Sequence, residues 1–182
     1  MGYDCVLAQV TERFLMDLSE ESVVAFFEQA RSEARGWPSN RPWFHEPLTT
    51  ADRQLPWPIS LQKMSAALHH LLTGEFRPVA SPLSRAIVGG TAFRIELCYG
   101  PARYLWAEEV REVAVALAAV TPADLRNRYD PVGLKAAGLE TPVHRDEDEK
   151  ELFDELDGYF QLLARYYRLA ATCGNAMMIA VV

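Results

Sequence analysis

The chain has 182 residues, of which 49% are apolar and 24% charged, and its formal net charge is −7. This length suits one domain that folds without disulfides or metal ions, and the acidic balance argues against broad nucleic-acid binding. Because no apolar run reaches about 18 residues, we expect no membrane-spanning helix, and the first residues do not resemble a signal peptide.

Cys5, Cys98 and Cys173 are the three cysteines, and they lie far apart along the chain. An odd number without C-x-x-C spacing argues against a disulfide framework and against a zinc site. All three stand among apolar residues, so we expect them to be buried free thiols. Free thiols in turn indicate a reducing compartment.

The first half of the chain predicts a strand followed by two helices. The apolar segment Cys5–Val10 is typical of a strand. Ser19 is a good N-cap for a helix that Gly36 would end, and Ser60 is the expected N-cap of a second helix that Gly74 would end.

Between these helices lies a loop, 37–58, that contains five of the prolines and three of the four tryptophans. Its tryptophans are Trp37, Trp43 and Trp57. Aromatic anchors are enriched in interfaces, so one hypothesis is an interaction loop. The alternative is a long loop that its aromatic side chains hold against the core.

The region after Gly74 predicts a short helix and then a strand. Ser81 is the expected N-cap of the helix, with proline at its first position. Apolar and polar residues alternate over 93–99, which indicates a strand with one core face and one more polar face. A longer helix is predicted for about 108–120 and a short one from Thr121 to Leu125, after which Gly133 and Gly138 interrupt the chain.

The C-terminal part predicts the longest helix and a final strand. The helix follows the acidic stretch 146–151, has a broad apolar stripe and ends at Gly174. The apolar segment Met177–Val182 is typical of a buried strand. We therefore predict one α+β domain over 1–182, in which several helices pack on a small, mostly antiparallel sheet of three strands. The long C-terminal helix is expected to precede a buried C-terminal strand.

The sequence contains no nucleophile elbow, phosphate-binding loop, dinucleotide fingerprint or zinc-protease motif, so no catalytic residue and no cofactor are assigned. His69 and His70 are the only neighbouring histidines. Adjacent helical residues point about 100° apart, so the pair does not predict a metal site.

Three stretches resemble the YfbM-like family of bacterial proteins, which is a domain of unknown function. They are Leu68–Gly74, Tyr99–Leu105 and Ala170–Ala176. The resemblance implies a compact α+β fold in the bacterial cytoplasm and implies no reaction. Two stretches depart from the family. Residues 62–66 lack an Asp-Lys-x-Trp-His run, and Trp106-Ala107 replaces Thr-Pro, which removes a helix cap worth about 1 kcal/mol.

Arg103 is the main candidate for ligand binding, with Tyr99, Tyr104 and His69 as its assistants. A guanidinium presents a planar fork of donors that suits a carboxylate or phosphate. The alternative is that Arg103 pairs with a nearby glutamate, Glu108 or Glu109, or caps carbonyls. For His69 the alternative is a hydrogen-bonded packing residue, and Asn175 is expected to bond to its neighbouring backbone.

Two functions remain open from the sequence. The first is a non-catalytic binding or interaction domain with an unknown protein partner, with self-association as one option. The second is a protein or enzyme that binds a small anionic ligand around Arg103. An open pocket that contains both Arg103 and His69 would favour the second function.

Overall fold

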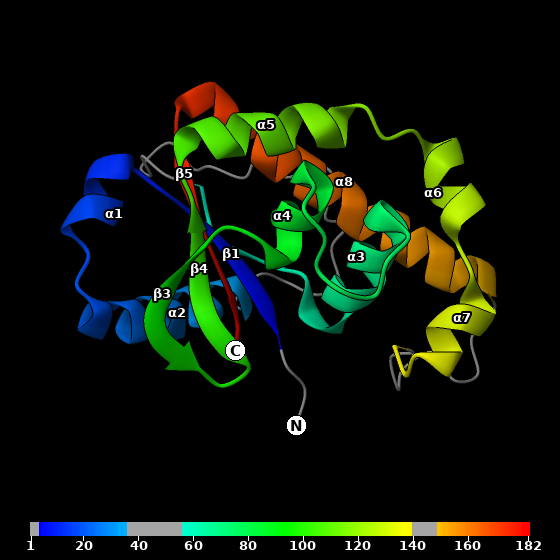
Figure 1. The fold of residues 1–182 in the computed structure, drawn as a ribbon, viewed down its shortest axis with the longest axis horizontal. Coiled ribbons are helices and arrows are strands. Elements are labelled where there is room, and N and C mark those ends of the chain that lie inside the picture. The colour runs from blue at the N-terminus through cyan, green and yellow to red at the C-terminus, as the bar shows by residue number, and fades with distance from the viewer. Residues whose placement is uncertain (1–3, 36–55, 140–148) are drawn as a thin grey trace.

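The computed structural model describes residues 4–35, 56–139 and 149–182 (Figure 1). Five strands form one sheet of order β2-β1-β5-β4-β3, in which every neighbouring pair is antiparallel. The strands are β1 (Cys5–Val10), β2 (Ile59–Ser60), β3 (Thr91–Leu97), β4 (Gly100–Leu105) and β5 (Ala176–Val181). The C-terminal strand β5 is therefore the central strand.

Eight α-helices and one short 3₁₀ turn, Gln62–Met64, surround the sheet in the described part of the chain. The helices are α1 (Glu12–Asp17), α2 (Glu20–Arg35), α3 (Ser65–Thr73), α4 (Pro82–Val88), α5 (Ala107–Ala118), α6 (Pro122–Arg128), α7 (Pro131–Ala136) and α8 (Glu149–Cys173). The predicted α+β class is confirmed, together with the long C-terminal helix and the buried strand that follows it.

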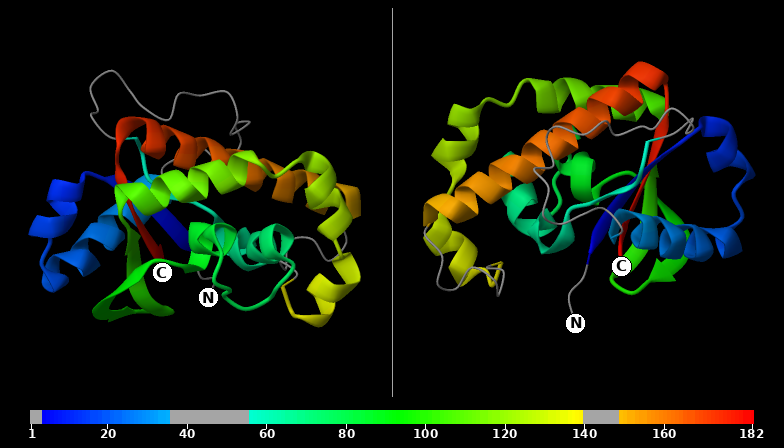
Figure 2. Two further views of the ribbon diagram at one scale, coloured as in Figure 1. Left: turned by 45° about the horizontal axis from the view of Figure 1, so that its top comes forward. Right: turned by 180° about the vertical axis from the view of Figure 1, so that it is seen from behind.

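The sheet separates two layers of helices, as Figures 1 and 2 show. Helices α1 and α2 lie on one face, and α3, α4, α5 and α8 lie on the other. Along β5 the side chains alternate between the two cores: Met178 faces α2, while Met177 and Ile179 face α8. Because both faces are covered, β5 is a continuous apolar run and β1 is apolar at every position except Gln9, rather than alternating.

Several helix ends form as the sequence predicts. The Ser81 side chain accepts a hydrogen bond from the backbone N–H of Ser84 at 3.1 Å, and that of Thr121 accepts one from Asp124 at 3.1 Å. The glycine after α3, Gly74, has a φ of 76° in the left-handed region. These helix-capping interactions join residues that are close in the sequence, so they can be predicted without the tertiary structure.

Other local predictions are wrong. Ser60 does not cap a helix but lies in β2 opposite Val6, and its hydroxyl bonds to the Asp4 carboxylate. Gly133 does not interrupt the chain, because the Asp130 side chain accepts its N–H at 2.9 Å and so starts α7. The segment Gly100–Leu105, for which no strand was predicted, is strand β4, and the helix α1 was not predicted either.

The expectation of three buried thiols is correct for Cys5 only. Cys98 and Cys173 are free and exposed. Burial raises the pKa of the Cys5 thiol to about 12, with a smaller contribution from Asp4, so this group stays protonated. Among the described residues, no helix is both long and apolar enough to span a membrane.

Candidate functional site

Arg103 lies in β4, opposite Ala92 of β3 and Ile179 of β5. Its Nη1 atom donates to the carbonyl oxygen of Gly90 at 3.3 Å. Glu109 does not contact it and instead pairs with Arg85 at 3.3 Å. The guanidinium therefore holds the turn between α4 and β3 by capping a carbonyl.

The two tyrosines do not share a pocket with Arg103. Successive side chains of a strand point to opposite faces, so Tyr104 lies on the α2 face of the sheet. There its ring packs against Phe93 and Trp106, with centroid distances of 4.9 and 5.4 Å. Tyr99 lies in the turn between β3 and β4 and is 52% exposed, rather than at the end of the strand as predicted.

His69 is a hydrogen-bonded packing residue of α3. Only 3% of it is exposed. Its Nδ1 lies 3.1 Å from the carbonyl oxygen of Glu75, and its Nε2 lies 2.9 Å from the hydroxyl of Ser84. Burial lowers the pKa of the imidazole, because water no longer solvates the charged form. The next residue, His70, points elsewhere and stacks on Phe76.

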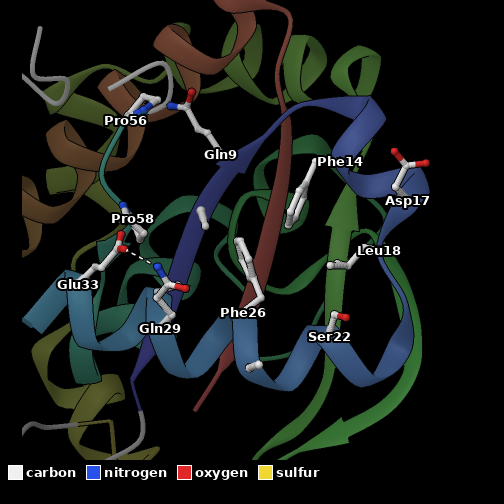
Figure 3. Close-up of a pocket in the computed structure, with 13 residues that line it drawn as sticks. Gln9, Phe14, Asp17, Leu18, Ser22, Phe26, Gln29, Glu33, Pro56 and Pro58 are labelled. Carbon is white, nitrogen blue, oxygen red and sulfur yellow. Dashed lines mark hydrogen bonds between the residues drawn. The ribbon is translucent and has the colours of Figure 1, made fainter. Parts of the chain in front are cut away.

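A larger pocket than the one between α5 and α8 lies on the α2 side of the sheet. It is a groove of about 740 Å³ between α1, α2, the end of β1 and residues 56–58 (Figure 3). Its walls are mostly apolar; they are formed by Ala8, Phe14, Leu18, Ala25, Phe26, Ala30, Pro56 and Pro58. We call this the α1–α2 groove, and it contains none of Tyr99, Arg103, Tyr104 and His69.

Phe14 and Phe26 form the aromatic wall of the α1–α2 groove. Their ring centroids are 5.6 Å apart, and Figure 3 shows both rings in the space between α1 and α2. Phe14 remains 40% exposed although it is a large apolar side chain. An aromatic side chain that is open to solvent within a groove is an anchor point for another apolar group.

Polar side chains line the two ends of the groove. Asp17 and Ser22 lie at one end, and Gln29 and Glu33 lie towards the other, where Gln29 donates to Glu33 at 3.0 Å. Both ionisable side chains in the lining, Asp17 and Glu33, are acidic. The groove thus combines apolar walls with a negative rim.

Gln9 closes the groove at the end of β1 through a buried polar network. Its backbone N–H donates to the Tyr166 hydroxyl and its side-chain amide donates to the Tyr166 carbonyl, both at 3.0 Å. The Asn175 amide donates to the Gln9 side chain at 3.1 Å. The expectation that Asn175 bonds to its neighbouring backbone is therefore wrong for its side chain, which links β5 to β1.

Two carboxylates at the start of α5 compensate for the helix cap that is lost where Trp106-Ala107 replaces Thr-Pro. Glu109 accepts the backbone N–H of Trp106 at 3.0 Å, and Glu12 of α1 accepts that of Ala107 at 3.1 Å. Both charges lie at the positive end of the helix dipole. The second bond also fixes α1, and with it one wall of the groove, against α5.

The sequence reasoning missed the α1–α2 groove because it missed α1. The available signal was Thr11, which accepts the backbone N–H of Phe14 at 3.1 Å as an N-cap and is followed by an acidic first turn. Of the predicted interaction loop, Trp57 is half-buried, whereas Trp37 and Trp43 lie outside the described residues. Within those residues, no group of three or more His, Cys, Asp or Glu side chains could hold a metal ion.

The comparisons with known proteins agree with the fold. A search of curated proteins finds no match. The crystal structure of YfbM from Escherichia coli, a protein of unknown function, is similar over 98% of this chain and 99% of that chain, with a TM-score of 0.61 and 19% identity. The model of the family described as domain of unknown function DUF1877 matches residues 1–180. The chain, whose motifs already resemble YfbM-like proteins, therefore belongs to the DUF1877 family of domains of unknown function.

Proposed function

We propose that this protein is a non-catalytic binding domain, and that its α1–α2 groove receives an amphipathic, basic segment of a partner protein. The observation that carries the proposal is the groove itself, with apolar walls and only acidic ionisable residues in its lining. Its volume of about 740 Å³ falls within the range of pockets that enclose a ligand or several side chains.

The apolar walls supply the affinity in this proposal. Burying one leucine or phenylalanine side chain of the partner between Phe14, Leu18 and Phe26 contributes about 1.5–3 kcal/mol. Two such anchors together contribute about 3–6 kcal/mol, which offsets part of the cost of association, so weak and reversible binding is the expected result.

The charges supply the selectivity. Asp17 pairs with Arg13 at 3.8 Å, but both side chains are highly exposed, so this pair is weak and Asp17 can exchange it for a partner's lysine. The overall charge of −7 also favours the approach of a basic segment. A partner with apolar residues flanked by lysine or arginine fits both features.

A pair of synthetic amphipathic peptides tests the proposal. One alternates leucine and lysine blocks, and the other carries glutamate in place of each lysine. We expect the basic peptide to shift the amide NMR signals of α1 and α2, and we expect the acidic peptide to leave them unchanged.

Variants of the groove complete this test. Phe26→Ala is expected to weaken binding of the basic peptide about 10-fold, since one anchor contact is lost. Phe76→Ala, which alters an exposed aromatic side chain on the opposite layer, is the matched control. Equal binding of both peptides, or equal binding by the Phe26 variant, would refute the proposal.

A second candidate function is an anion site around Arg103 alone, without the tyrosines and His69 that the sequence suggested as its assistants. It is favoured by one observation: within the described residues, the only hydrogen bond of the guanidinium is to the Gly90 carbonyl. Its other N–H groups are thus available to a carboxylate or phosphate. Thermal shift measurements with metabolites and common anions, on the wild type and Arg103→Ala, distinguish this function: only a stabilisation that the variant loses supports it.

We also propose a reducing compartment, as in the bacterial cytoplasm that the resemblance implies. The support is that Cys98 and Cys173 are exposed free thiols. Cell fractionation of the bacterial host tests it, and recovery outside the cytoplasmic fraction would contradict it.

A further inference from the structure

Among the described residues, the outer edge of β3 is open. In the order β2-β1-β5-β4-β3, this strand pairs with β4 on one side, and no described strand pairs with it on the other. Figures 1 and 2 show the β3–β4 hairpin at the rim of the molecule, with α2 behind one face. An open edge presents unpaired backbone N–H and C=O groups, to which another strand can add.

The side chains of β3 are arranged in two opposite rows. Phe93, Ile95 and Leu97 are half-buried and pack on the α2 side of the sheet. Arg94 and Glu96 are exposed on the other face, and neither forms an ion pair with another described residue. The strand therefore has one apolar face and one face with a single positive and a single negative charge.

We propose that β3 is a self-association edge, on which the β3 strand of a second copy pairs antiparallel about a twofold axis at Ile95. In this register Arg94 lies opposite the partner's Glu96, and Glu96 lies opposite the partner's Arg94. On the α2 side, Phe93 lies opposite the partner's Leu97. Because a twofold interface repeats each contact, one strand supplies both opposite-charge pairs and both apolar pairs.

Other registers are unfavourable for this strand. A shift of two residues in one direction places Arg94 opposite the partner's Arg94, and a shift in the other direction places Glu96 opposite the partner's Glu96. Like charges that face each other directly destabilise a sheet. A shift of one residue would turn the partner's apolar row onto the polar face. The sequence of β3 thus selects the register about Ile95.

The backbone of the hairpin agrees with this register. The turn Cys98–Tyr99 pairs Leu97 with Gly100, so Leu97 directs its backbone groups towards β4. By alternation, Arg94 and Glu96 direct theirs outward. The ladder with β4 is irregular between Ala92 and Glu96, but the exposure of the side chains still alternates over 93–97. The two charged residues are then the hydrogen-bonded pair of the new ladder.

Charge reversal tests the proposal by sedimentation velocity over a range of concentrations. We expect the wild type to dimerise, and we expect Arg94→Glu or Glu96→Arg to raise the dissociation constant at least about 10-fold, since each creates two like-charge pairs. The double variant R94E/E96R restores opposite charges in the same register and is expected to dimerise like the wild type. Arg111→Glu, at an exposed position of α5, is the matched control.

A cysteine at the axis tests the register independently. With Cys98→Ser and Cys173→Ser as background, Ile95→Cys is expected to form an intermolecular disulfide under mild oxidation. A non-hydrogen-bonded antiparallel pair has Cα atoms about 4.5 Å apart, within disulfide reach. Ala92→Cys in the same background is expected not to cross-link, because in this register residue 92 of one copy does not lie opposite residue 92 of the other. A monomeric wild type, a dimer indifferent to both single charge reversals, or equal cross-linking at both positions would overturn the proposal.

Discussion

The buried imidazole of His69 makes the stability of the fold depend on pH, and His69→Gln should remove that dependence. Its Nδ1 faces a carbonyl oxygen, that of Glu75, so this nitrogen carries the proton of the neutral ring. Nε2 then accepts from the Ser84 hydroxyl, whose oxygen in turn accepts the backbone N–H of Val79 at 3.1 Å. The neutral ring therefore joins α3, α4 and the segment between them.

The sign of the effect follows from the lowered pKa of His69, whose main cause is burial. In the unfolded chain a histidine titrates at about 6.5. Below that pH the imidazole is protonated in the unfolded state but still neutral in the folded state. The free energy of unfolding therefore decreases as the pH falls. The contribution of the neutral ring is fully present above about pH 6.5 and is lost as the pH falls through the folded-state pKa. The slope for this single group is at most about 1.4 kcal/mol per pH unit.

Urea unfolding of the wild type and His69→Gln between pH 7.5 and 5 provides the measurement. Carboxylates titrate in both proteins, so the difference between the two curves isolates the imidazole. We expect this difference to change by up to about 1 kcal/mol over the first pH unit below 6.5. His70→Gln, at the adjacent ring that stacks on Phe76, is the matched control and is expected to keep the wild-type dependence. Parallel curves for the wild type and the His69 variant would refute the reasoning.

Three further substitutions, with Gly138→Ala as a control, test the packing around the sheet, each by urea unfolding at pH 7.5. Tyr166→Phe removes the acceptor of the buried Gln9 N–H and is expected to cost about 1–3 kcal/mol; no loss would show that this bond is not needed. Gly90→Ala is expected to cost about 3 kcal/mol or more, because φ is 96° and a Cβ atom would lie 2.4 Å from a carbonyl oxygen of β4. Gly138→Ala, with a φ of 69° and open space around it, should cost clearly less. Glu109→Ala removes a cap of α5 and an ion pair, and a loss of about 1–2 kcal/mol is expected.

The predictions that succeeded rest on interactions between near neighbours in the sequence. Ser81 and Thr121 cap helices because their hydroxyls reach a backbone N–H three residues later. Gly74 and Gly174 end helices because they adopt a left-handed backbone, with φ of 76° and 68°. The final apolar run forms a strand because an uninterrupted sequence of this kind is stable only when both faces are covered.

The predictions that failed depend on partners distant in the sequence. Gly100 and Pro101 are typical of a turn, yet they begin β4, which lies between β3 and β5 in the sheet. Serine is a favourable N-cap residue, but the backbone of Ser60 pairs with Val6, which comes much earlier in the chain. In both places the hydrogen bonds of the sheet outweigh the local preference.

The candidate site shows the same division. Arg103 and Tyr104 are adjacent in the sequence, but the strand directs their side chains to opposite faces of the sheet. Their proximity in the sequence therefore does not place them in one ligand site. The α1–α2 groove depends on α1, on α2 and on residues 56–58, which meet only after β1 enters the sheet.

The sequence by itself determined the class of the fold, several of its helix caps and the burial of its last strand, because these follow from local hydrogen bonds and from the period of apolar residues. The tertiary structure alone decided the order of the strands, the face on which each side chain lies and the position of the groove. The physical reason is that these features depend on long-range pairing, whose partners a local pattern does not identify.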